Sequence, residues 1–263
     1  MTSYPEFRAE FPAAENLIYF DSATVALGSR AAAASYKDSV DRWVEGRFGW
    51  SEGISAADEC RAGLARLIGA RTEEISVQPS VSSASGLIAS QFPEARSGEN
   101  VVVGEQEFSS NFMPWTSLRE KGYEIRHVQI GQNGPSLDDF AAQVDSRTRL
   151  LAVSAAQSAT GFLADRAGLA ELAHQHGARL FVDAAQAAGA VPIDVTAEGV
   201  DFMAIPSYKF MLGTRGMGYL YVRQEHLDQF GPLSPNWLST ESPSTQSSVC
   251  RRGYKSGSAS QWD

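Results

Sequence analysis

The sequence predicts an α/β fold in which helices cover both faces of a mostly parallel sheet. Two observations lead to this prediction: short continuous apolar runs are typical of buried strands, and stretches with helical spacing lie between several of them. The predicted strands are 101–104, 125–130, 149–154, 179–183, 201–205 and 216–222. The clearest predicted helices are 137–144 and 166–176, and 55–68 and 81–92 are further candidates upstream.

Composition limits the classes of protein and partner. A chain of 263 residues with 43% hydrophobic and 20% charged residues can build one large domain, or one domain with a small appendage. The net charge of −9 and the lack of a Lys/Arg cluster before residue 250 argue against a nucleic-acid partner. No apolar run approaches a membrane span, and residues 1–11 do not resemble a signal peptide. We therefore expect a cytoplasmic protein with no membrane partner.

The chain shows no internal repeat, but its composition changes near Gly231. We expect an N-terminal segment over 1–30 and one large domain over 31–263. Within that domain, 231–263 is rich in Ser, Pro, Thr and Gly and is expected to form a loop-rich tail. Cys60 and Cys250 offer neither a disulfide framework nor zinc spacing, and Cys60 is expected in the core.

Two charged side chains follow predicted strands, at the edge of the sheet where ligands bind in such folds. Asp183 ends one apolar run, and a buried carboxylate there needs a partner such as a protonated pyridine nitrogen. An Asp that caps a following helix is an equally compatible interpretation. Lys209 follows another strand and precedes a glycine-bearing turn. If this lysine is buried, the pKa of its amine falls and it can form a Schiff base; the alternative is a solvated loop lysine.

Six segments, in the same order along the chain, resemble those of the class V aminotransferase and cysteine desulfurase group of fold-type-I pyridoxal-phosphate (PLP) enzymes. They are 17–24, expected to hold an opening strand and a small-residue turn near the substrate, and 79–86, 105–115, 153–161, 181–186 and 207–209. The resemblance extends from about Leu17 to the last residues. It implies the large domain of that fold, PLP as cofactor, and a transferase or lyase that acts on a small amino-acid substrate.

The resemblance also implies roles for individual residues. Lys209 would carry the cofactor as a Schiff base and move protons, Asp183 would keep the pyridine nitrogen protonated, and Gln186 would contact the phenolic oxygen. Ser82 and Ser83 would bind the phosphate at a helix N-terminus, although a plain N-cap role fits the same sequence. The further implied cofactor contacts are Phe108, Ser158 or its neighbour Gln157, Ser207, Tyr208 and Ser258.

Several positions depart from the pattern of the family. Phe108 stands where cysteine desulfurases have a histidine over the cofactor ring. A phenyl ring can stack there but cannot act as acid or base, which argues against sulfur removal by the usual route. Tyr208 also replaces a histidine, and Ser158 stands where desulfurases tend to have an Asn. Ser207 lies two residues before the lysine, whereas many members of the family have a serine three before it.

The histidines offer no metal site from sequence. His174 and His176 lie two residues apart on a predicted helix, so their side chains point in different directions. His127 falls within a predicted strand and His226 in a surface-like segment. We expect structural or solvent-facing roles for all four.

Gly257 and Ser258 match a segment that, in the family, touches the phosphate of the neighbouring subunit, which implies a homodimer. Members of the family continue beyond the equivalent of Asp263 into a smaller C-terminal domain, which holds the substrate carboxylate. The expected function is therefore that of a PLP-dependent enzyme acting on an amino acid or amine, with transamination, C–S lysis and epimerisation all open. The alternative is a truncated or degenerate homologue that binds PLP or a partner chain without turnover. An α/β ligand-binding domain without covalent chemistry ranks last, because it gives no reason for Asp183, Gln186 and Lys209 to occur together.

Overall fold

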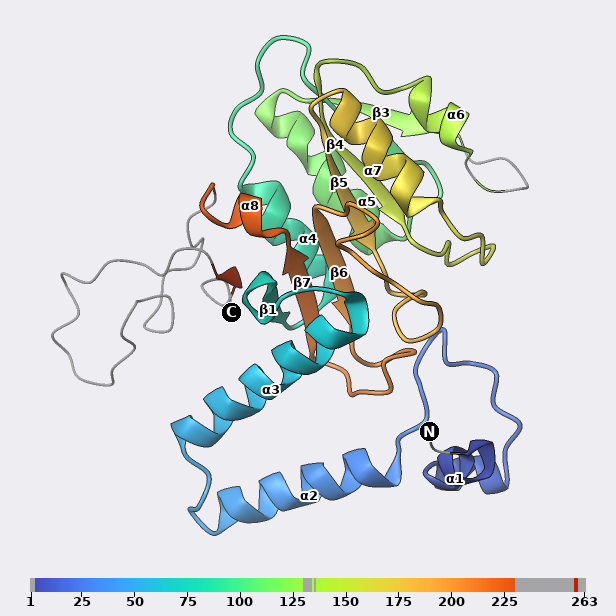
Figure 1. Cartoon of the computed structure of the whole chain (residues 1–263), viewed down its shortest axis with the longest axis vertical. Helices are drawn as coiled ribbons and strands as arrows, with labels where there is room; N and C mark the ends of the chain where they lie inside the picture. The colour runs from blue at the N-terminus through green and yellow to red at the C-terminus, as the bar shows by residue number, and fades with distance from the viewer. Residues whose placement is uncertain (1–2, 130–133, 135, 230–257, 260–263) are drawn as a thin grey trace, which may run out of the picture.

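The structure, a computed structural model, describes residues 3–129, 134, 136–229 and 258–259. A seven-stranded sheet with the order β1-β7-β6-β5-β4-β2-β3 forms its centre (Figure 1). The strands are β1 Ile75–Gln78, β2 Asn100–Gly104, β3 Glu124–Val128, β4 Thr148–Ser154, β5 Arg179–Asp183, β6 Phe202–Pro206 and β7 Gly218–Val222.

The sheet is mostly parallel, as predicted. Strands β3, β2, β4, β5 and β6 run in one direction, and β7 is antiparallel to both of its neighbours, β6 and β1. The bounds of β5 coincide with the prediction, and the other predicted strands agree to within two residues at each end. The unpredicted strand is β1, whose four residues, Ile-Ser-Val-Gln, are too few and too polar to stand out as an apolar run.

Helices cover both faces of the sheet, because successive strand residues point to opposite faces and both sets are apolar. Val102 belongs to a core shared with α3, α6 and α7, whereas Val101 and Val103 belong to a core shared with α4, α5 and α8. The helices are α1 Tyr4–Ala9, α2 Arg30–Val44, α3 Trp50–Ile68, α4 Val81–Ser90, α5 Ser109–Thr116, α6 Leu137–Ala141, α7 Arg166–Gln175 and α8 Gln224–Leu227. No helix among the described residues has both the length and the apolar character that crossing a membrane requires.

The N-terminal part of the chain differs most from the prediction. The strand expected within 17–24 is wrong: this segment pairs with no described strand, and the side chains of Ile18 and Phe20 are 90% and 93% exposed. Helix α2 buries none of its residues and extends away from the sheet (Figure 1). Cys60 is half-buried against the core of the α3 face, close to its expected place. Apart from residues 258 and 259, the expected tail, with Cys250 and Gly257, lies outside the described residues.

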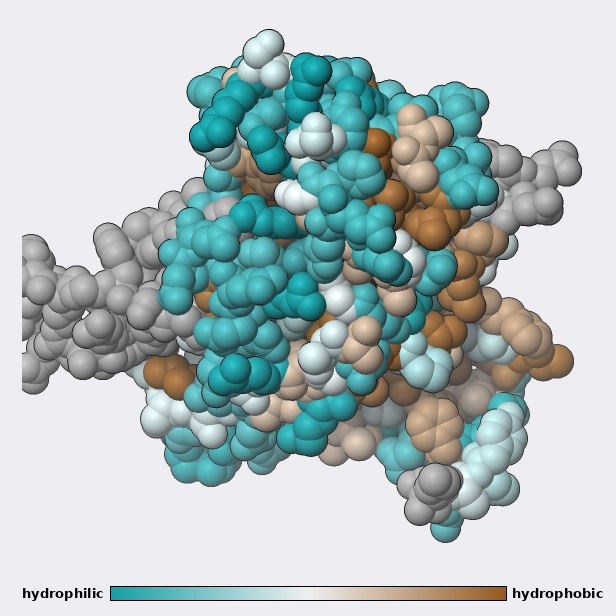
Figure 2. All heavy atoms as spheres, turned by 45° about the horizontal axis from the view of Figure 1, so that its top comes forward, coloured by the Kyte–Doolittle hydropathy of each residue, from teal (hydrophilic) through white to brown (hydrophobic). Residues whose placement is uncertain are grey.

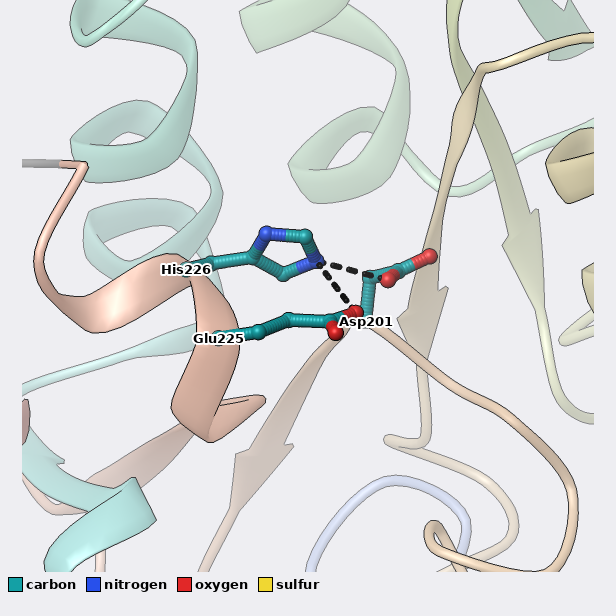
Figure 3. Close-up of side chains that lie close together, drawn as sticks. All are labelled: Asp201, Glu225 and His226. Atoms are coloured by element: carbon teal, nitrogen blue, oxygen red, sulfur yellow. Dashed lines mark hydrogen bonds and ion pairs between the residues drawn. The ribbon is translucent and has the colours of Figure 1, made fainter.

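A buried polar cluster joins the amino ends of β5 and β6, opposite the edge at which ligands are expected. Asp201 Oδ2 accepts a hydrogen bond from Leu180 N (2.7 Å) and lies 2.8 Å from His174 Nε2, while Oδ1 lies 2.7 Å from His226 Nε2 (Figure 3). Burial opposes the charge, but these hydrogen bonds outweigh it and hold the pKa of Asp201 well below its usual range. The hydrogen bond between Asp201 and His174 raises the pKa of His174.

His226 is therefore buried, and the prediction of a surface-like segment is wrong. With Asp201 and Glu225 it forms a group whose ligand atoms lie close enough for a metal ion (Figure 3). The guanidinium of Arg223, 3.5 Å from Asp201 Oδ1, places a permanent positive charge beside them. That charge disfavours a cation, so the hydrogen bonds give the cluster a structural role.

We expect Asp201→Asn to lower the free energy of unfolding by about 2–4 kcal/mol at pH 6, because it unpairs a buried network. The contribution of Asp201 is present above its unfolded pKa of about 3.9 and is lost as pH falls. The contribution of His174 to stability is complete below its unfolded pKa of about 6.5. It is lost as pH rises through the raised pKa of His174 in the folded state. Urea unfolding should show the largest deficit between about pH 4.5 and 6.5, with a smaller one at about pH 9. An equal deficit at both pH values would contradict this account, and Asp138→Asn on the exposed face of α6 is the control.

Candidate functional site

Two buried ionisable side chains lie where neighbouring strands end. Asp183 is the last residue of β5 and is 3% exposed. Lys209 follows the end of β6 by three residues and is 9% exposed. The solvated-loop interpretation of Lys209 is therefore wrong. Because parallel strands present their carboxyl ends at one edge, the sheet brings these residues together as the sequence predicts.

The environment of Asp183 favours a neutral carboxyl group. A turn follows it, not a helix, and Oδ1 accepts a hydrogen bond from Ala185 N at 2.8 Å, so the helix-cap interpretation is wrong. Burial raises the pKa of Asp183 to about 7, with a further increase from the charge of Glu107; the Ala185 hydrogen bond and Lys209 act in the opposite direction. A carboxyl group with this pKa readily shares a proton with a basic partner.

The environment of Lys209 shifts its amine toward the neutral form. Burial lowers its pKa, and the attraction of Asp183 offsets this only in part. The Nζ atom lies 5.7 Å from the centroid of the Phe108 ring and makes no hydrogen bond in the described part of the chain. A neutral amine with an unused lone pair is a nucleophile toward carbonyl groups.

A tight turn fixes the chain after Lys209. Leu212 N donates to Lys209 O at 2.9 Å, and Leu212 adopts a left-handed conformation with φ 60°. Gly213 N donates to Ser207 O at 2.7 Å, and a Cβ atom at Gly213 would lie 2.8 Å from Cβ of Ser207. The glycine in the predicted turn is therefore required by close approach to the segment before the lysine.

The small-residue turn near the N-terminus reaches this edge of the sheet, even though the strand expected before it is absent. Gln186 Nε2 donates to Ala23 O at 3.2 Å and to Ser158 Oγ at 3.5 Å. Ala26 N donates to the carbonyl of Tyr208 at 2.8 Å. These bonds place Gln186, Ser158 and Tyr208 around the ends of β4, β5 and β6.

The start of α4 separates two roles that the sequence left open for Ser82 and Ser83. Ser80 is the N-cap, and its Oγ accepts from Ser83 N at 3.1 Å, so the N-cap role proposed for Ser82 and Ser83 is wrong. Ser82 Oγ donates to Ser110 Oγ at 2.9 Å. Ser110 lies two residues after Phe108, so this bond links the first turn of α4 to the segment beside Lys209.

Ser207 and Ser258 have different surroundings from these serines. Ser207 is buried, and its hydroxyl lies 2.5 Å from Thr214 O and 2.8 Å from Met217 O. Its hydrogen is thus directed to backbone carbonyls of its own loop, which leaves no donor for a phosphate. Ser258 is half-buried next to buried Ala259, and its contact with a second subunit stays a prediction.

A buried hydrogen-bond network around Glu107 was not predicted. Its Oε1 accepts from Ser154 N (2.8 Å) and Gln157 Nε2 (2.6 Å), and its Oε2 accepts from Asn111 Nδ2 (2.8 Å) and from the hydroxyl of Ser154. Trp115 Nε1 donates to Asn111 Oδ1 at 3.0 Å. The available signal was the spacing of Asn111 and Trp115, four residues apart in α5, with Glu107 four residues before Asn111.

Comparison with known proteins identifies the family. Residues 31–258 match the family model described as aminotransferase class-V. The chain is 29% identical over 243 residues to an uncharacterized aminotransferase, YcbU, of Bacillus subtilis; the match covers 92% of this chain and 65% of the relative. It is 32% identical over 246 residues to a cysteine desulfurase of Klebsiella pneumoniae, covering 88% of this chain and 60% of the relative. The chain thus spans less than two thirds of the length of these curated relatives.

Solved structures share the fold. An apo cysteine desulfurase of Thermococcus onnurineus NA1 superposes with a TM-score of 0.81 at 26% identity, and CsdA of Escherichia coli with 0.84 at 23% identity. Each match covers 100% of this chain and 67% of the other. The resemblance based on six sequence segments is confirmed, and because the family model matches most of its length, the chain belongs to the class-V aminotransferase family.

Proposed function

We propose that the chain forms the cofactor-binding part of a PLP-dependent enzyme that acts on an amino acid or amine. The pairing of Asp183 and Lys209 carries this proposal. Burial drives the carboxyl and the amine toward their neutral forms, with pKa values shifted in opposite directions. A ligand with a carbonyl group for the amine and a basic ring nitrogen for the carboxyl satisfies both, and PLP has both groups.

The residues present fit this cofactor. In the described part of the chain, one hydrogen bond reaches the carboxyl of Asp183, at Oδ1, so Oδ2 remains able to accept from a ring N–H. The Phe108 ring is 53% exposed and lies near Lys209 Nζ, where a flat aromatic ligand can stack on it. Ser82 and Ser83 lie in the first turn of the ten-residue helix α4, whose N-terminus favours a phosphate; their hydroxyls would exchange their present bonds to Ser110 and Ser80 for it.

Bound PLP supplies an electron-withdrawing ring that stabilises negative charge on a substrate carbon. With the cofactor bound, Asp183 would hold a proton at the ring nitrogen, and Lys209 would move a proton at that carbon. Phe108 cannot transfer protons, so the proposed chemistry assigns this task to Lys209. Transamination, C–S cleavage and epimerisation all begin with removal of that proton, whereas sulfur removal through an acid at position 108 is excluded by the phenyl ring.

Mixing the protein with PLP should give an absorbance band that borohydride reduces to an adduct on one of the four lysines, Lys209. Mass spectrometry of the digested protein locates the adduct. Lys209→Ala should lose both the band and the adduct, and Lys37→Ala, on exposed α2, should keep them. An adduct on another lysine, or none, would refute the proposal. If the adduct forms but no amino acid changes the spectrum, the chain binds PLP without turnover.

Asp183→Asn should weaken PLP binding about tenfold, because an amide cannot form the charge-assisted bond to a protonated ring nitrogen. Absorbance titration measures the dissociation constant, with Asp138→Asn as the surface control. An unchanged constant in Asp183→Asn would remove Asp183 from the ring-nitrogen site.

A second copy of the chain is part of the proposal. Apolar side chains lie exposed on α2 and at the start of α3, with Trp43 70% and Trp50 71% exposed, and on the N-terminal segment at Ile18 and Phe20. Hydrophobic residues also gather on the lower right of Figure 2, the side on which Figure 1 places α1. Apolar patches of this kind mark interfaces, and a homodimer would let Ser258 of one copy approach the phosphate of the other.

Light scattering should therefore give about twice the chain mass of 28.3 kDa. Trp43→Glu together with Trp50→Glu should shift the protein toward the monomer, while Leu137→Glu on α6 should not. A monomeric wild-type protein would exclude the dimer and the role of Ser258 across it.

The location and the domain limits complete the proposal. Cys60 is a free thiol, which suits the reducing conditions of the cytoplasm. The match of the family model from residue 31 onward supports a cofactor-binding domain over 31–263 after an N-terminal segment of 1–30.

A further inference from the structure

Glu107 is a buried carboxylate beside the candidate site, and the proposed chemistry gives it no role. It follows β2, and its partners Ser154 and Gln157 belong to the end of β4 and the loop after it. Its hydrogen bonds therefore join the carboxyl ends of two neighbouring strands.

The pattern of donors favours the ionised form of Glu107, against the effect of burial. Each of its two oxygens accepts two hydrogen bonds, so all four acceptor positions are filled. The N–H of Ser154 can only donate, and the Trp115 bond to Oδ1 of Asn111 turns the Asn111 amide so that its NH₂ faces Glu107. Burial raises the pKa of Glu107, but a proton on Oε1 would face two groups that can only donate, and on Oε2 only the Ser154 hydroxyl could accept it.

Glu107 lies one strand away from Asp183. Ser154, which donates to Glu107 from both its backbone and its hydroxyl, pairs with Asp183 across β4 and β5. Ala155 N also donates to Asp183 O at 2.8 Å. The charged groups that act on Asp183 are thus Glu107 on the β2–β4 side and Lys209 from the segment after β6.

The amide of Gln157 depends on the same charge. Its Nε2 donates to Glu107, so Oε1 points away from the carboxylate; among the described residues this buried oxygen has no hydrogen-bond partner. A rotation of the amide would place Oε1 against the negative charge. Glu107 therefore sets the orientation of the Gln157 amide and leaves its Oε1 as an unused acceptor.

We propose that Glu107 is a positioning residue of the cofactor site, which fixes Ser154 and Gln157 and, by its negative charge, holds Asp183 in a state able to carry a proton. This inference rests on the proposed function for its purpose. Its physical content, the coupling of Glu107 to Asp183, exists without the cofactor and is testable in the cofactor-free protein.

The test is a pH titration of Asp183 in cofactor-free protein labelled with ¹³C at the Asp carboxyl groups, followed by NMR. Asp183→Asn assigns the signal. Glu107→Gln should move the midpoint of Asp183 from about 7 to a value lower by about half to one pH unit, because a nearby negative charge is lost. Glu99→Gln is the matched control: Glu99 is equally buried, is paired with Arg149 at 2.7 Å, and lies at the amino end of β2.

An unchanged midpoint in folded Glu107→Gln, or an equal shift in Glu99→Gln, would overturn the inference. Circular dichroism checks the fold. If Glu107→Gln does not fold, Ser154→Ala replaces it; this variant removes one donor, makes Glu107 easier to protonate, and should lower the Asp183 midpoint by a smaller amount. No shift in that variant would also count against the coupling.

In the PLP-loaded protein, Glu107→Gln should lower the midpoint of the pH-dependent absorbance change by a similar amount, because protonated nitrogens near Asp183 lose the same stabilising charge. The two proposals can fail separately. If wild-type protein forms no adduct at Lys209, the proposed function fails while the cofactor-free titration still decides the coupling. If the adduct forms and neither midpoint moves, only the role of Glu107 is refuted.

Discussion

The desolvation of two ionisable side chains at the carboxyl edge of the sheet is the constraint on which the rest of the site depends. Asp183 and Lys209 are buried at the ends of strands β5 and β6, so hydration does little to stabilise their charged forms. Each shifts toward its neutral form, and the turn at Gly213 keeps the lysine there. Burying these two groups without a partner costs free energy. A ligand that bonds to the Lys209 amine and donates a hydrogen bond to the Asp183 carboxyl offsets that cost.

The two ends of the sheet treat a buried aspartate in opposite ways. Asp201, at the amino ends, accepts hydrogen bonds from Leu180 and two histidines, and its pKa falls. Among the described residues the carboxyl of Asp183, at the carboxyl ends, has one hydrogen bond, and its pKa rises to about 7. Both side chains are buried, so the number of donors and the sign of the nearby charge make the difference. A fully paired carboxylate contributes stability, whereas an underpaired one marks a place where a ligand completes the network.

Glu107 connects these observations. Four hydrogen bonds favour its charged form without a cation, and this charge makes Asp183 harder to ionise. Phe108, the next residue, presents a ring toward Lys209 and carries no acid or base. One short segment after β2 therefore provides both a carboxylate that acts on Asp183 and an aromatic ring beside Lys209. That combination favours chemistry in which Lys209 moves the proton.

The sequence by itself determined six of the seven strands and the two residues at the carboxyl edge of the sheet. Continuous apolar runs mark strands buried on both faces, and a charged residue directly after such a run must lie at the strand end, as Asp183 does. Only the tertiary structure decided the partners. Glu107 and Gln157 lie 50 residues apart, and His226 and Asp201 lie 25 residues apart. No local pattern encodes such pairs, because they depend on how neighbouring strands are ordered and aligned. The strand at Ile18 was predicted from the resemblance to the family, but no described strand lies beside this segment to complete the ladder.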